Sequence, residues 1–259
     1  MNSVIIHPDA YLHPLEKAAA ARIVGLSKMT AWMESNLGGS MDSVNRYVCS
    51  SSSLRIPEGR HVRRLAEDAA KRFGLETLPE LYLTRTFSYE IQLGGYEFPT
   101  LTLPSVLLEQ ADELILRCRL SAAMAGVRAG HHRMEYLLWL TENMAGTVPI
   151  PFAGQSVCTL LYQWQRAMVY SRDRAAFLGT GDLESALRNI LFGVVPAETL
   201  RNFRFGEEGT FDAQVVRYRG GLLEKTLGAL GSIMQNYAWL PERYRLLTEF
   251  AKGGAGDES

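Results

Sequence analysis

Cysteine is scarce in this chain, and long apolar runs are missing. The three cysteines, Cys49, Cys118 and Cys158, are odd in number, widely spaced and set among apolar neighbours. They predict reduced core residues and exclude a disulfide framework or a zinc knuckle. No run of about 18 uninterrupted apolar residues occurs, so we expect no transmembrane helix.

An excess of charge of one sign is also lacking. The chain carries 27 Lys and Arg against 28 Asp and Glu, which gives a formal net charge of −1. This balance argues against a nucleic-acid partner. The N-terminus lacks the basic start and apolar centre of a signal peptide. We therefore expect a soluble, cytoplasmic protein without membrane insertion.

What is present is a helix-rich pattern without internal repeats or linkers. At 259 residues and 47% hydrophobic content, the chain is long enough for one sizeable core. We predict an α+β, mostly α fold with a small sheet. Its single domain spans residues 1–252 and includes a helical arm at 1–50, and the small polar residues at 253–259 predict a disordered tail.

The chain is organised around a predicted helix over residues 110–144, which begins with acids and contains no proline. Residues 100–106 form the clearest strand, and Pro104 within it indicates an edge position, because proline cannot donate to a ladder. Further strands are expected at 54–56 and 81–83. Further helices are expected at 15–36, 41–49, 57–73, 157–178, 182–192, 211–230 and 241–252.

The middle of the 110–144 helix has many small residues: Ser121, Ala122, Ala123, Ala125, Gly126, Ala129 and Gly130. Such a run allows a close backbone approach or marks the loss of larger side chains. Three segments, in this order along the chain, favour the loss of larger side chains. The first is PELYL followed by residues 99–131, the second is QWQRAMVYSRDRAAFLGTGDLESALRNIL, and the third is LPERYRLLTEF. Together they resemble the HtpX-like zinc metallopeptidases, gluzincin relatives of the CAAX prenyl endopeptidase.

The resemblance implies a zincin-like fold that lacks the zinc ligands and the catalytic glutamate. In the family's H-E-x-x-H, two histidines one turn apart bind zinc, and the glutamate activates a metal-bound water. Aligned on Gly130-His131, those three positions hold Ala122, Ala123 and Gly126. Val169 stands where a later helix supplies the third ligand. None of these side chains binds zinc or moves a proton, so we expect no catalytic residue, no metal and no cofactor.

The resemblance favours a catalytically inactive homologue that binds a peptide or protein partner as an accessory or scaffold protein. A peptide would add to the predicted edge strand at Thr100, Leu101, Thr102 and Leu103, beside Asp173 and Arg174. The alternatives are new chemistry or small-ligand binding in the emptied cavity, and a purely structural subunit that can be a homo-oligomer.

Two polar groups have competing interpretations. His131, His132 and Glu135 fit a relocated metal site, but a solvated turn with local pairing is favoured, because no further histidine follows at the right spacing. Asp173 lies between two arginines and fits a catalytic acid, but a buried brace between helices is favoured, because buried carboxylates are usually paired.

Overall fold

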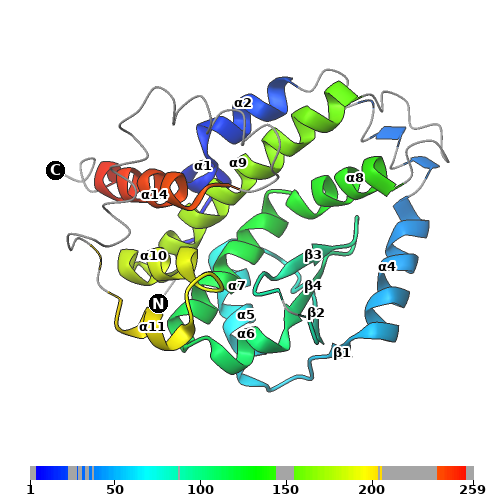
Figure 1. Cartoon of the computed structure of the whole chain (residues 1–259). Helices are drawn as coiled ribbons and strands as arrows, with labels where there is room; N and C mark the ends of the chain where they lie inside the picture. Colours follow the sequence, from blue (N-terminus) through cyan, green and yellow to red (C-terminus); the bar gives the residue numbers. More distant parts are fainter. Residues whose placement is uncertain are drawn as a thin grey trace.

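The computed structural model describes residues 4–22, 38–86, 88–143, 155–203 and 238–254, together with positions 28, 31, 32, 35, 36 and 205. This part of the chain is mostly helical and contains one four-stranded sheet, as predicted (Figure 1). None of its helices combines the length and the apolar character that a membrane span requires.

The sheet has the strand order β1-β2-β4-β3. Its two longest strands, β2 (Glu80–Thr84) and β4 (Thr100–Pro104), run parallel. The short outer strands, β1 (Leu54–Arg55) and β3 (Gln92–Gly94), are both antiparallel to their neighbours. The predicted strands at 54–56, 81–83 and 100–106 are therefore present.

The predicted edge position of the 100–106 strand is wrong. β4 lies inside the sheet, between β2 and β3. Pro104 is tolerated because it is the last residue of β4 and also the N-cap of α6 (Ser105–Gln110), so its missing N–H falls at the end of the ladder. The described sheet has its edges at β1 and β3.

The predicted single helix over 110–144 is two helices, which follow the short α6. After α6, α7 (Glu113–Arg128) begins at Asp112, whose carboxylate accepts a hydrogen bond from the backbone N–H of Ile115. α7 ends before Gly130, which has a φ of 78°. This left-handed conformation interrupts the helical path, and α8 (His131–Asn143) starts in a new direction.

The remaining helices agree with most of the predicted ones. Asp182 caps its helix as predicted, with its carboxylate accepting from Glu184 and Ser185. The predicted tail is helical as far as Gly254. The predicted helix at 211–230, residues 255–259 and the side chain of Cys158 lie outside the described residues. The bounds are α1 (Pro8–Tyr11), α2 (Pro14–Arg22), α4 (Gly38–Ser52), α5 (His61–Arg72), α9 (Gln155–Thr180), α10 (Leu183–Leu191), α11 (Ala197–Arg201) and α14 (Leu240–Gly254).

Helices α7 and α9 form the centre of the molecule (Figure 1). They approach so closely that a Cβ added to Gly179 would lie 2.2 Å from the Ser121 hydroxyl. Cys49 and Cys118 are free and buried, as predicted.

Candidate functional site

The space beside Gly126 is the part of the structure where the resemblance places the second histidine of a zinc site. Gly126 is buried on α7. A Cβ built on it would lie 3.0 Å from Leu93 Cδ1, 3.1 Å from Arg172 Nε and 3.3 Å from His131 Nδ1. Side chains from β3, α8 and α9 therefore fill this space.

The other three degenerate positions carry no polar function. Ala123 is 5% exposed within the main core. Ala122 is half-buried and packs against the apolar cluster that includes Cys118, Ala176 and Leu247. Val169 is half-buried on α9, three residues before Arg172. Ala, Ala, Gly and Val offer no donor atoms to a zinc ion, so these residues do not fit the metal that the resemblance implies.

His131 and Arg172 stand at the centre of a buried polar network. Arg172 donates from Nε to His131 Nδ1 over 3.2 Å, and His131 Nε2 lies 2.9 Å from Glu16 Oε1. Because Nδ1 accepts, the proton of a neutral imidazole is on Nε2 and is donated to Glu16. Arg172 also forms an ion pair with Glu135 through its terminal nitrogen. The guanidinium thus supplies a fixed positive charge beside Gly126.

Glu16 of α2 links this network to the N-terminal arm. Its carboxylate accepts hydrogen bonds from Ser171 Oγ and, over 3.5 Å, from Trp164 Nε1. Burial alone would raise the pKa of Glu16, but the hydrogen bond and charge of His131, with the bonds from Ser171 and Trp164, hold it below its usual range. Glu16 therefore stays ionised in the interior, with its charge shared among donors.

The alternative metal ligands do not converge. His131 contacts Glu16, Glu135 contacts Arg172, and His132 Nε2 donates to the Tyr96 carbonyl over 3.1 Å. Across the described ranges, no three His, Cys, Asp or Glu side chains come together as metal ligands. The favoured solvated turn is wrong as well, because His131 and His132 are 1% and 5% exposed.

Two buried histidines predict a loss of stability on acidification. Burial, helped by the charge of Arg174, lowers the pKa of His13 to about 4. Burial, helped by Arg133, lowers that of His132 to about 4. An unfolded histidine binds its proton near pH 6.5, so acidification from there to about pH 4 favours the unfolded chain. We expect each histidine to reduce the free energy of unfolding by up to about 1.4 kcal/mol per pH unit in this window.

Urea unfolding between pH 7 and pH 4.5 measures this slope. His132→Gln should make it shallower, because it removes one of the two imidazoles whose pKa burial lowers to about 4. His61→Gln is the matched control, since the His61 side chain is 57% exposed, and it should leave the slope unchanged. Equal slopes for all three proteins would contradict the assignment.

Asp173 is the buried brace that the sequence predicts. It is 4% exposed and accepts two hydrogen bonds from Arg243 of α14, at 2.8 and 2.7 Å. Its neighbour Arg174 lies over the Phe250 ring of the same helix, 4.4 Å from the ring centroid. Both residues therefore fasten α9 to α14 and are not free to meet a peptide.

The predicted peptide-binding strand is not available either. Leu101 and Leu103 are fully buried, and Thr100, at 1% exposure, accepts a hydrogen bond from Asn45 of α4. The β4 backbone pairs with β2 on one side and with β3 on the other. A peptide cannot add to a strand that already has two neighbours.

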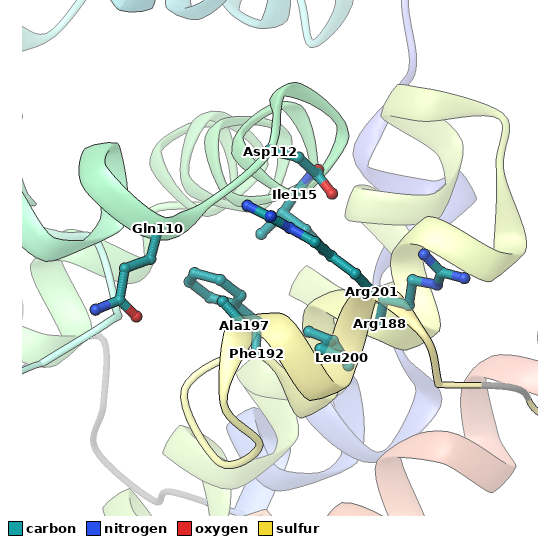
Figure 2. Close-up of a pocket in the computed structure, with 8 residues that line it drawn as sticks. All are labelled: Gln110, Asp112, Ile115, Arg188, Phe192, Ala197, Leu200 and Arg201. Carbon is teal, nitrogen blue, oxygen red and sulfur yellow. The ribbon is translucent and has the colours of Figure 1, made fainter.

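A small pocket lies elsewhere, where the α7 N-terminus meets α10 and α11 (Figure 2). Its walls combine the polar side chains of Gln110 and Asp112 with the apolar side chains of Ile115, Phe192 and Leu200. None of the degenerate positions lines it.

The comparisons with known proteins identify no relative. No protein-family model, no curated protein and no solved structure matches this chain.

The sequence did not predict the roles of three residues. These are Glu16, Arg172 at the centre of the polar network, and Arg243 as the partner of Asp173. Glu16 and His131 are 115 residues apart, and Asp173 and Arg243 are 70 apart. No motif spacing joins residues at such separations. One local signal existed, because Arg172 directly precedes Asp173 within the segment that carries the resemblance.

Proposed function

We propose that the chain is a non-catalytic homologue of the HtpX-like metallopeptidases that binds an extended segment of a protein partner. The observation that carries the proposal is the filled space beside Gly126. An arginine with both a histidine and a carboxylate as partners occupies the place of a metal ligand. This partly buried, hydrogen-bonded ion pair links α9 to α8 and offers no open coordination position.

The filled space also bears on the alternatives. New chemistry or small-ligand binding in an emptied cavity requires room beside Gly126. Leu93, Arg172 and His131 lie so close that even a Cβ on Gly126 would be nearer to them than an ordinary van der Waals contact. The packing instead supports the binding and scaffold functions, which need no cavity.

The edge strand β3 is the most suitable site for the partner segment. Among the described residues it pairs with β4 on one side and with no strand on the other. Gln92 is exposed, and Leu93 next to it packs toward Gly126. A peptide that adds to a sheet edge binds through backbone hydrogen bonds, which require no metal. This replaces β4 as the proposed binding strand.

Titration with an unfolded protein tests the proposal. Fluorescein-labelled β-casein is titrated with the purified chain at neutral pH, with and without added zinc, and gel electrophoresis monitors cleavage. We expect a saturable rise in anisotropy and intact casein under both conditions. Zinc-dependent cleavage, or no binding, would overturn the proposal.

Hydrogen exchange then locates the contact. Casein should slow exchange of the amides at 91–95, in and around β3. The opposite sheet edge, β1, is the internal control and should exchange at an unchanged rate. Protection confined to β1 would place the binding at the wrong edge.

A further inference from the structure

A groove lies against the loop that joins α10 to α11. It has a volume of about 370 Å³, and most of its wall is apolar, formed by Tyr89, Phe192, Val194, Val195 and Pro196. The Tyr89 and Phe192 rings meet edge to face, with their centroids 5.3 Å apart. This volume is within the range of pockets that bind small organic molecules, so the groove has room for an apolar group.

One end of the groove is positively charged. The groove shares Gln110, Phe192 and Ala197 with the small pocket beside the α7 N-terminus, so the two hollows adjoin each other (Figure 2). The small pocket adds the side chains of Arg188 and Arg201 to the wall. An apolar groove therefore leads to two guanidinium groups.

The polar side chains at this end have unused hydrogen-bond donors. Arg201 is exposed and, within the described ranges, forms no ion pair. Arg188 donates from Nη2 to Glu184 over 2.6 Å, but its Nε is buried and has no hydrogen-bond partner. Gln110 accepts from the Tyr89 hydroxyl through Oε1 over 3.1 Å, which leaves its amide N–H groups as donors. A bound molecule would therefore meet donors and should carry acceptors.

Asp112 is the one acid among the residues that line the groove and the small pocket. Its carboxylate accepts from the backbone N–H of Ile115 at 2.8 Å and caps α7. The positive end of the helix dipole offsets this negative charge. Two guanidinium groups beside one capping carboxylate favour a singly charged anion over a cation, and the nearby Asp112 disfavours a doubly charged phosphate.

We propose that this groove binds a small organic carboxylate with an aromatic or short hydrocarbon group. The apolar group lies against Tyr89, Phe192 and Pro196, and the carboxylate lies against Arg201. A planar guanidinium matches the two oxygens of a carboxylate and can donate to both. None of the degenerate positions lines the groove, and the inference does not rest on peptide binding at β3.

Isothermal titration calorimetry with phenylpropionate at neutral pH tests the site, and phenylpropanol is its uncharged counterpart. We expect saturable, one-to-one binding of the acid. The alcohol should bind about tenfold more weakly, because it lacks the charge-assisted hydrogen bonds to the guanidinium. An acid that gives no saturable heat overturns the proposal, and so does an acid that binds no more tightly than the alcohol.

Two variants locate the bound molecule. Arg201→Gln should weaken binding of the acid about tenfold and leave that of the alcohol unchanged, because it removes only the charge. Val194→Glu should weaken both, because it adds a charge to the apolar wall. Val194 is 63% exposed and Arg201 is exposed, so neither change disturbs the core.

Arg64→Gln is the matched control, since Arg64 is an exposed arginine of α5 that does not line the groove. It should bind both compounds as the unaltered chain does. If Arg201→Gln binds the acid as tightly as Arg64→Gln does, the carboxylate does not meet Arg201 and the proposal is wrong. If Val194→Glu binds both compounds normally, the apolar group lies elsewhere, which also contradicts it.

Discussion

Replacing Asp173 with alanine is expected to lower the free energy of unfolding by about 3–5 kcal/mol. The change leaves the Arg243 guanidinium, 13% exposed, without the two hydrogen bonds it donates to Asp173. A buried charge without its partner costs more than the pair itself contributes, which is why the effect is large. Urea or thermal unfolding measures it.

Two controls distinguish the loss of the Asp173–Arg243 ion pair from the effect on stability of removing any acidic side chain. Asp68→Ala removes an exposed carboxylate from α5 and should change the free energy by less than about 0.5 kcal/mol. The double variant Asp173→Ala with Arg243→Ala should be less destabilised than the sum of the two single variants, because neither charge is then left alone. An unchanged melting temperature for Asp173→Ala would show that the brace has no structural role.

Restoring the family's metal site is expected to unfold the protein. The variant combines Ala122→His, Ala123→Glu, Gly126→His and Val169→Glu. At Gly126 even a Cβ would lie 3.0–3.3 Å from Leu93, Arg172 and His131. Each added side chain is expected to cost about 1–3 kcal/mol by overpacking. Together they approach the whole stability of a typical domain, about 5–15 kcal/mol. Circular dichroism and urea unfolding measure the loss.

A fifth change, Arg172→Ala, distinguishes overpacking from a wrong alignment. It removes the guanidinium beside Gly126. The five-fold variant is expected to be more stable than the four-fold one and to bind about one zinc per chain, because three ligands then surround an open position. Elemental analysis after dialysis measures the zinc. A four-fold variant as stable as the unaltered chain and free of zinc would mean that the alignment of α7 with α9 is wrong, and the family resemblance with it.

The sequence alone determined the features that depend on neighbouring residues. Most helices appear where the periodic apolar positions predict them, because residues three and four apart share a helix face. Asp182 caps α10 because its side chain reaches the N–H groups two and three residues further on. The absence of donor atoms at Ala122, Ala123, Gly126 and Val169 is likewise a property of the residues themselves.

Only the tertiary structure decided how these elements meet. β4 became an inner strand because residues 92–94 pair along its second side, and strand order does not follow from the pattern within one strand. Gly130 bends the chain between α7 and α8, which turns His131 toward Glu16, 115 residues away. The Arg172 guanidinium fills the space beside Gly126 because the packing of α7, α8 and α9 brings it within reach of His131 and Glu135, which both lie on α8. Local propensity cannot specify such contacts, since their free energy arises only when distant faces are buried together.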